Sequence, residues 1–292
     1  MNDLSRGLRR AATPATRISG TDATHAFTVA AAVNDRDVLR CNLFRSPNIQ
    51  RAPVTQILLK ENWPSAGRAY NAAIDEAVND IIVFVHQDIF LPDGWLANLT
   101  RCLDVMTQGG IDWGVLGCFG VSAGAPRGVG RIYSTGWGRI GRYITGPEAV
   151  DTLDEIVLVL RKSSGLRFDD ALPYFHLYGA DLCLAARAMG KTSYAFPGYC
   201  VHNTNQLLTL PSEFYACYRY LKQKWSRFLP VQTSCIRISR FDGPLHLRRL
   251  QETYAAIRGK ARRPVRRFSD PTPFAQDVLT EDADVPSAAS DG

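Results

Sequence analysis

Three short apolar runs in the first third of the chain predict β-strands, at Phe27–Val33, Thr55–Lys60 and Ile81–Val85. The third run shows no alternation of apolar and polar positions, which is typical of a strand in a parallel sheet covered on both faces. Ser65 is placed to cap a helix that continues through Ala77 with its apolar residues on one face. The order strand, helix, strand predicts an α/β protein.

The same pattern continues to about residue 258. Apolar runs predict further strands, and apolar positions three and four residues apart predict further helices. The predicted strands are 113–119, 156–162 and 193–196, and the predicted helices begin near Trp95, Leu182, Pro211 and Pro244.

Polar residues follow each of the first three predicted strands, at Asn34 and Asp35, at Glu61, and at His86 and Asp88. Right-handed connections between parallel strands bring such ends to one edge of a sheet, where open α/β proteins bind ligands. A carboxylate and an imidazole can hold a divalent cation, which would neutralise a diphosphate. Strand-terminal polar residues that are merely solvated are the ordinary alternative.

Two common nucleotide-binding classes are disfavoured. No Gly-x-Gly-x-x-Gly pattern follows the first strand, and no P-loop lysine motif occurs in the chain. A nucleotidyltransferase would usually carry a glycine-rich basic loop after the first strand, where this chain has Asn34-Asp35-Arg36-Asp37. A nucleotidyltransferase is therefore a disfavoured alternative.

Composition indicates a globular protein of 292 residues, 46% of them apolar, with a net charge of +6. Nine Lys and Arg residues against two acids lie between Arg240 and Arg267, and six acids without a base follow from Phe268 to Gly292. This pattern predicts a basic helix and an acidic tail, and no nucleic-acid-binding motif accompanies it.

The seven cysteines are scattered singly, and the apolar runs are far shorter than the ~20 residues that span a bilayer. We expect a cytoplasmic protein.

Two isolated residues have ordinary explanations from the pattern alone. Asp181 falls in the first turn of a predicted helix, where a carboxylate caps or interacts with the helix dipole. His202 follows a short apolar segment, where a single histidine is by default a satisfied polar residue.

Four motifs in sequence order change that picture: Ala69–Ala73, Phe84–Asp88, Tyr178–Leu184 and Val201-His202. Together they resemble the family-two glycosyltransferases of the GT-A fold, and most closely the bacterial subgroup with His-Gln-Asp in place of Asp-x-Asp. The resemblance covers about residues 27 to 230. It implies an α/β, GT-A (Rossmann-like nucleotide-diphospho-sugar transferase) single domain with a mostly parallel central sheet and C-terminal helices.

The resemblance also implies a nucleotide-sugar donor and a Mn²⁺ or Mg²⁺ ion, with a saccharide or lipid-linked acceptor. Asp88 matches the carboxylate that binds metal and pyrophosphate, and His202 matches a distant metal ligand. The residues expected to bind the donor are Asn34, Asp35, Glu61, Asn71, His86 and Asp88.

Asp181 matches the last acid of the family's Glu-Asp-x-Asp pattern, where the base of inverting enzymes is found. Tyr178 and Gly179 replace the preceding acidic pair. The resemblance therefore leaves Asp181 or His176 as the base. If neither serves, the protein is a nucleotide- or sugar-binding module without turnover.

We expect the following division of the chain. Residues 1–25 form a disordered arm, and 26–232 form the GT-A domain, with the donor half at 26–120 and the acceptor half at 121–232. A basic helical extension follows at 233–267 and an acidic disordered tail at 268–292. The basic stretch suggests peripheral contact with the inner membrane face, whereas oligomeric state is left open.

Overall fold

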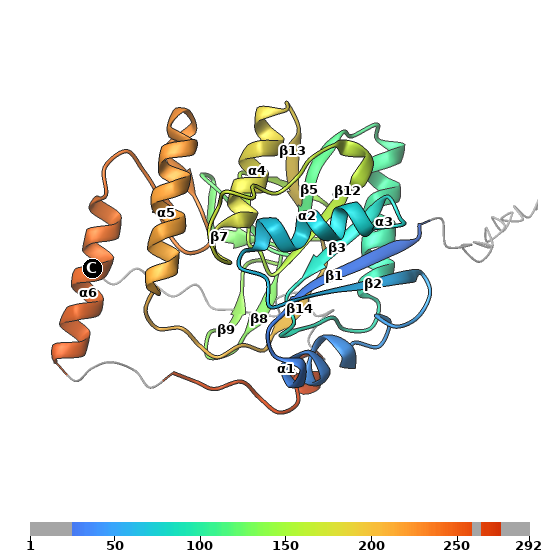
Figure 1. Cartoon of the computed structure of the whole chain (residues 1–292), viewed down its shortest axis with the longest axis horizontal. Helices are drawn as coiled ribbons and strands as arrows, with labels where there is room; N and C mark the ends of the chain where they lie inside the picture. The colour runs from blue at the N-terminus through green and yellow to red at the C-terminus, as the bar shows by residue number, and fades with distance from the viewer. Residues whose placement is uncertain (1–24, 259–263, 276–292) are drawn as a thin grey trace, which may run out of the picture.

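A seven-stranded sheet in the order β10-β13-β5-β12-β3-β1-β2 forms the centre of the protein (Figure 1). The computed structural model describes residues 25–258 and 264–275. The strands of this sheet are β1 Phe27–Val33, β2 Val54–Glu61, β3 Ile81–Val85, β5 Trp113–Gly117, β10 Glu148–Val150, β12 Val157–Arg161 and β13 Thr192–Ala195. The helices are α1 Arg36–Cys41, α2 Ala66–Glu76, α3 Trp95–Gln108, α4 Tyr178–Ala188, α5 Ser212–Lys224 and α6 Gly243–Ile257.

The sheet is mostly parallel, as expected. β1 pairs in parallel with β2 and β3, and β13 pairs in parallel with β5. β12 lies antiparallel between β3 and β5, and β10 pairs antiparallel with β13. Five strands therefore point one way and only β12 and β10 point the other way, which confirms the predicted α/β class.

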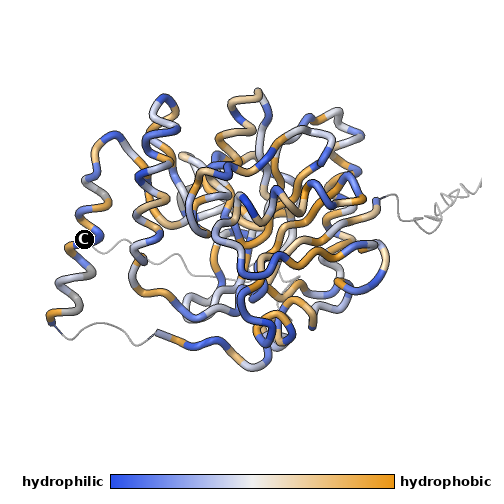
Figure 2. Tube along the Cα trace, viewed as in Figure 1, coloured by the Kyte–Doolittle hydropathy of each residue, from blue (hydrophilic) through white to orange (hydrophobic). Residues whose placement is uncertain are grey.

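Two hydrophobic layers cover the sheet. Successive residues of a strand face opposite sides, so Ile82 and Phe84 of β3 pack with α2 and α4, whereas Val83 and Val85 pack with α3. All five residues of β3 are buried. This burial on both faces explains the unbroken apolar run, and the central strands are mainly hydrophobic in Figure 2.

The local signals for helix ends hold in α1 and α2. The Ser65 hydroxyl accepts a hydrogen bond from the Arg68 N–H at the start of α2. The Asp35 carboxylate accepts from the N–H groups of Asp37 and Val38 and so caps the six-residue α1. Both caps satisfy donors that have no partner within the helix.

The remaining strands are short and form smaller sheets beside the central one. A four-stranded sheet has the order β4-β14-β8-β9, and in it His202 of β14 pairs with Ile89 of β4. This pairing brings the second half of the chain to the end of β3. The remaining strands are β4 Ile89–Phe90, β6 Gly120–Ser122, β7 Ala125–Val129, β8 Ile132–Ser134, β9 Gly138–Ile140, β11 Thr152–Leu153, β14 Cys200–His202, β15 Val231–Gln232 and β16 Arg237–Ile238, and 3₁₀ turns lie at Leu43–Arg45, Lys162–Ser164, Ser226–Phe228 and Thr272–Ala275.

The C-terminal region differs from the expected extension and tail. α6 lies beyond α5 at the side of the domain (Figure 1) and contributes Leu245 to the core. Residues 264–275 return to the body and end in a 3₁₀ turn, although 268–275 were expected within a disordered tail. The arm at 1–24 and the tail at 276–292 lie outside the described residues. Among the helices described, none has the length and apolar character needed to cross a bilayer.

Candidate functional site

The carboxyl ends of β1, β2 and β3 meet at one edge of the sheet, because the three strands are parallel neighbours. Gln87, which follows β3, connects the end of β3 to the loop after β1. Its side-chain oxygen accepts hydrogen bonds from the N–H groups of Asn34 (3.0 Å) and Asp35 (3.1 Å), and its Nε2 donates to Asn34 Oδ1 (2.5 Å). The middle residue of the His-Gln-Asp motif therefore holds the loop that follows β1.

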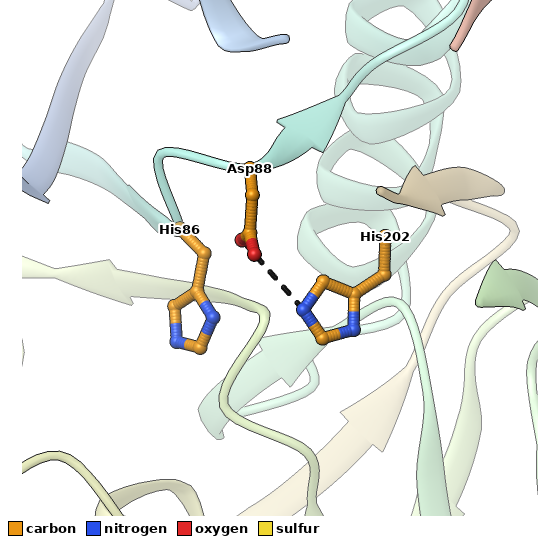
Figure 3. Close-up of side chains that lie close together, drawn as sticks. All are labelled: His86, Asp88 and His202. Atoms are coloured by element: carbon orange, nitrogen blue, oxygen red, sulfur yellow. Dashed lines mark ion pairs between the residues drawn. The ribbon is translucent and has the colours of Figure 1, made fainter. Parts of the chain in front are cut away.

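His86, Asp88 and His202 form a cluster at this edge (Figure 3). Each residue offers one ligand atom, and these atoms lie within 4.8 Å of one another. His202 Nε2 is 3.6 Å from Asp88 Oδ1, which is too long for a direct hydrogen bond. His86 Nε2 is 2.6 Å from the Tyr178 hydroxyl, so Nδ1 is the nitrogen left for another partner.

The donor set of this cluster fits a divalent cation. Imidazole nitrogens and a carboxylate oxygen suit first-row ions such as Mn²⁺ better than Mg²⁺, which prefers oxygen ligands. The Tyr178 hydroxyl would orient His86 in the way that outer partners orient metal-bound histidines. From the strand end the sequence predicted a cation site at His86 and Asp88, and from the resemblance one at Asp88 and His202; the structure brings all three side chains together.

Electrostatics favour a negative charge on Asp88. Burial would raise the pKa of this carboxyl, but His202, His86 and Thr204 together outweigh burial, and the pKa lies well below its usual range. Burial lowers the pKa of His202, but the Asp88 carboxylate leaves it above the usual value. Burial lowers the pKa of His86. The cluster thus combines an ionised carboxylate with a neutral imidazole at His86, whereas a cation that bound His202 would have to displace any proton on that ring.

A cavity of about 230 Å³ opens beside the cluster. Asn34, Asn62, Gln87 and Asp88 line it with polar groups, and Trp63 and Phe175 line it with aromatic rings. Polar groups with flanking aromatic rings suit a flat heterocycle that carries a charged group. A larger cavity of about 650 Å³ lies at the opposite edge of the sheet, near Asp80 and Arg161, away from the cluster.

Three of the residues expected to bind the donor already have partners within the protein. Asp35 caps α1. Glu61 pairs with Arg36, at 2.7 Å from Glu61 Oε1 to Arg36 Nη2. Asn71 is buried and bonds the backbone of Phe168 with both its oxygen and its nitrogen. The structure therefore places Asn34, His86 and Asp88 on the cavity, whereas Asn71 connects α2 to the 168–170 loop.

Asp181 lies in the first turn of α4 and is 2% exposed. Its carboxylate accepts hydrogen bonds from Lys224 Nζ (2.8 and 2.9 Å) and from Trp225 Nε1 (2.6 Å). Burial raises its pKa, although Lys224 and Trp225 oppose the rise. These contacts join α4 to the end of α5.

His176 lies in the loop before α4, next to the cavity residue Phe175. Tyr174 (φ 59°) and Leu177 (φ 62°), on either side of this pair, adopt left-handed backbone conformations. Such conformations are costly for residues other than glycine and tend to occur at functional sites. Burial lowers the pKa of His176, against an opposing effect of Glu213, so the ring is neutral near pH 7.

The sequence analysis did not include Glu155 among the site residues. Because β12 is antiparallel, its first residues lie at the same edge as the end of β3. Glu155 Oε1 accepts from the Leu177 N–H (3.0 Å), and its carbonyl oxygen accepts from the Tyr178 hydroxyl (3.0 Å). Burial and the neighbouring Asp154 raise the pKa of Glu155 to about 8. The acidic pair before this strand was the available signal.

Comparison with protein families finds no family model that matches. A protein of Fuscovulum blasticum described as ATP synthase subunits region ORF 6 is 27% identical over 158 residues, 51% of this chain. The matched region spans 61% of that protein.

The solved structures with a similar fold include three glycosyltransferases. GalNAc-T7 with UDP, GalNAc and Mn²⁺ shares 8% identity at a TM-score of 0.48, over 70% of this chain and 49% of that one. TarS of S. aureus with UDP-GlcNAc shares 11% at 0.43, over 68% and 66%. The mannosyltransferase PcManGT of Pyrobaculum calidifontis with GDP-Man and Mn²⁺ shares 13% at 0.42, over 73% and 68%. These values establish no shared activity.

Proposed function

We propose that this protein is a glycosyltransferase of the GT-A type that moves a sugar from a nucleotide-sugar donor to a saccharide or lipid-linked acceptor. The observation that carries the proposal is the cluster of His86, Asp88 and His202 beside a partly aromatic cavity at the carboxyl edge of the sheet. That edge is where open α/β proteins bind nucleotides. The four sequence motifs support the same function.

The chain's own groups can hold each part of such a donor. Asn34 and Asn62 offer polar contacts to a nucleoside, and Trp63 offers a ring face for its base. His86, Asp88 and His202 would hold Mn²⁺ or, less suitably, Mg²⁺ against the diphosphate. When bound, the ion would neutralise the charge that develops on the departing nucleoside diphosphate.

The acceptor hydroxyl must lose a proton as its oxygen attacks the sugar carbon. Asp181 is buried and bound to Lys224 and Trp225, and it would have to give up those bonds to act. Glu155, with a pKa of about 8, is mostly protonated at pH 7. His176 is neutral near pH 7 and is the sequence neighbour of Phe175, which lines the cavity. Of the two bases that the resemblance leaves open, Asp181 and His176, we therefore assign proton removal to His176, and an inverting course to the reaction.

A binding module without turnover is the second candidate, because Tyr178 and Gly179 stand where the family has acids. The Tyr178 hydroxyl contacts His86 rather than an acceptor site. Such a module would bind a nucleoside diphosphate with Mn²⁺ but release no product from a nucleotide sugar.

The deciding experiment is a thermal-shift panel of UDP, GDP, CDP and dTDP with and without Mn²⁺. We expect one diphosphate to raise the melting temperature only with the metal, because a ligand that binds the folded state stabilises it. Asp88→Asn should remove this shift. Asp112→Asn is the matched control, since Asp112 is an acid paired with Arg161 and Lys191 at the opposite edge. No shift in the wild type with any diphosphate would contradict the proposal.

A second assay separates the two candidates. The diphosphate that binds indicates the nucleotide of the donor, and its common nucleotide sugars are then incubated with a glycan mixture or a lipid extract. Release of diphosphate that depends on the acceptor supports the transferase. Binding without release supports the module.

A peripheral contact with anionic membrane is part of the proposal for lipid-linked acceptors. α6 exposes Leu247, Leu250, Tyr254 and Ile257, spaced as on one face of a helix. Arg248 and Arg249 lie on the same helix. Salt-sensitive pelleting with anionic vesicles would support this contact, and no pelleting would end it.

A further inference from the structure

Residues 264–275, which we name the C-terminal strap, run along the edge of the sheet that carries the metal-ligand cluster. Phe274 stacks on Tyr133 with ring centroids 4.4 Å apart, and its carbonyl accepts from the Tyr199 hydroxyl (2.9 Å). Gln206 and Val265 exchange two hydrogen bonds, one through the Gln206 side chain and one through its N–H. The strap is therefore attached at both ends.

Asn203, the neighbour of His202, sets the position of the strap at its centre. The Asn203 side chain is fully buried and bonds both backbone polar groups of Phe268. Its Oδ1 accepts from the Phe268 N–H (2.8 Å) and its Nδ2 donates to the Phe268 carbonyl (2.9 Å). The Asn203 N–H donates to the Asp88 carbonyl (2.9 Å). A single buried amide thus fixes the strap relative to two residues of the cluster.

This arrangement places Arg267 beside Asp88. Arg267 Nε donates to the Asn203 carbonyl (2.9 Å), which orients the guanidinium group. Arg267 Nη2 is 3.7 Å from Asp88 Oδ2, close enough for attraction but too far for a hydrogen bond. The side chain is 24% exposed, so part of the guanidinium group can still be reached.

A fixed guanidinium beside a cation site has an electrostatic consequence. Two charges of the same sign that are held close together at a protein surface repel each other. The single negative charge of Asp88 balances only part of the charge of an arginine and a divalent ion together, so a further anion that contacts both cations would be stabilised there. A diphosphate has the charge and the oxygens to meet both, and guanidinium binds phosphate oxygens in a planar fork.

We infer that Arg267 is a binding residue for the diphosphate of the donor, delivered to the site by the C-terminal strap. The inference rests on the proposed function for the identity of the donor, but the phosphate contact can be tested without turnover. Neither the motifs nor the family resemblance includes this residue, which lies well beyond the region that the resemblance covers.

The test compares Arg267→Ala and Arg267→Lys with Arg266→Ala. Arg266 is the adjacent residue of the same strap and is exposed, so it controls for charge and for the strap itself. Calorimetric titrations use inorganic pyrophosphate, the nucleoside diphosphate identified in the thermal-shift panel with Mn²⁺, and the matching nucleoside. Mn²⁺ binding alone is followed by electron paramagnetic resonance.

We expect Arg267→Ala to weaken diphosphate and pyrophosphate binding about 10- to 100-fold, because hydrogen bonds between charged groups are lost. Arg267→Lys should recover part of this loss, since it keeps the charge without the fork. Nucleoside affinity should not change, and Mn²⁺ should bind Arg267→Ala at least as well as the wild type. Arg266→Ala should match the wild type throughout.

The outcomes separate this inference from the proposed function. Equal pyrophosphate and diphosphate affinities in the wild type and Arg267→Ala would overturn the inference and leave the donor proposal standing. If pyrophosphate binding depends on Arg267 but the protein binds no nucleoside diphosphate, the inference is supported and the donor proposal is contradicted. Equal losses in Arg266→Ala and Arg267→Ala would reduce the effect to general charge and overturn the inference. Absence of pyrophosphate binding in the wild type would also overturn the inference.

Discussion

Two buried aspartates at the same edge of the sheet have opposite surroundings. Asp181 accepts three hydrogen bonds of 2.6 to 2.9 Å from Lys224 and Trp225. Asp88 has His202 Nε2 at 3.6 Å and Arg267 Nη2 at 3.7 Å, both beyond hydrogen-bond distance. The pKa of Asp181 is raised by burial, whereas the pKa of Asp88 lies below its usual range.

The difference indicates distinct roles. A carboxylate whose partners are already in contact joins two helices and gains little from a ligand. A carboxylate that lies near histidine nitrogens without a hydrogen bond to them is suited to a cation that binds the carboxylate and the imidazoles together. From this comparison we infer a ligand-binding role for Asp88 and a stabilising role for Asp181, which the following predictions test.

The largest expected effect is on Asp181. Asp181→Ala should lower the free energy of unfolding by about 3 kcal/mol, because the Trp225 N–H loses its acceptor inside the protein and Lys224 loses a buried partner. Urea unfolding followed by circular dichroism measures this loss. Diphosphate and Mn²⁺ affinities of the folded variant should match the wild type. An unchanged stability together with lost transfer would reverse the comparison and make Asp181 the base.

A second expectation concerns Glu155, whose pKa of about 8 lies above the ordinary value of 4.5. A carboxyl with a raised folded-state pKa contributes stability below pH 4.5 that is lost as the pH rises towards 8. Each proton involved changes the free energy of unfolding by about 1.4 kcal/mol per pH unit. Between about pH 5.5 and pH 7.5 the wild type should therefore lose about 2 kcal/mol relative to Glu155→Gln.

Urea titrations of the wild type and Glu155→Gln at several pH values test this expectation. Parallel pH profiles for the two proteins would mean that Glu155 is ionised in the folded state. Glu155 would then be a stronger candidate for the base than His176.

The smallest expected effect is on His176. Its imidazole should titrate below the ordinary 6.5, because burial disfavours the charged ring, and Glu213→Gln should lower the pKa further by removing a nearby negative charge. Heteronuclear NMR of the histidine rings measures both values, with the signal assigned by its loss in His176→Gln. A pKa above 6.5 would leave His176 partly protonated at pH 7 and weaken its assignment as base.

Local pattern was sufficient for the strands and helices of the donor half. The apolar run of β3, the Ser65 cap and the spacing along α3 can each be read within a short stretch of sequence, and the structure confirms all three. The topological rule for parallel strands also placed Asn34 and His86 at one edge, as observed. These features depend on short sequence separations and on handedness, which the residues themselves encode.

The short strands and the strap were not predicted. β4 and β14 are two and three residues long, too short for a periodic pattern to appear. Residues 264–275 appeared in sequence only as the junction of a basic and an acidic stretch. The metal role of Asp88 and His202 stays a prediction, although their proximity is now observed.

By itself the sequence determined the class of the fold and the edge of the sheet at which polar residues gather, because both follow from local periodicity and chain handedness. Only the tertiary structure decided which of those polar residues are already satisfied. Lys224 reaches Asp181, Phe168 reaches Asn71, and Arg267 stops short of Asp88, and each of these contacts joins segments far apart in the chain. Whether a buried charge has a partner is a property of the packed molecule, and that property separates a structural aspartate from one prepared for a ligand.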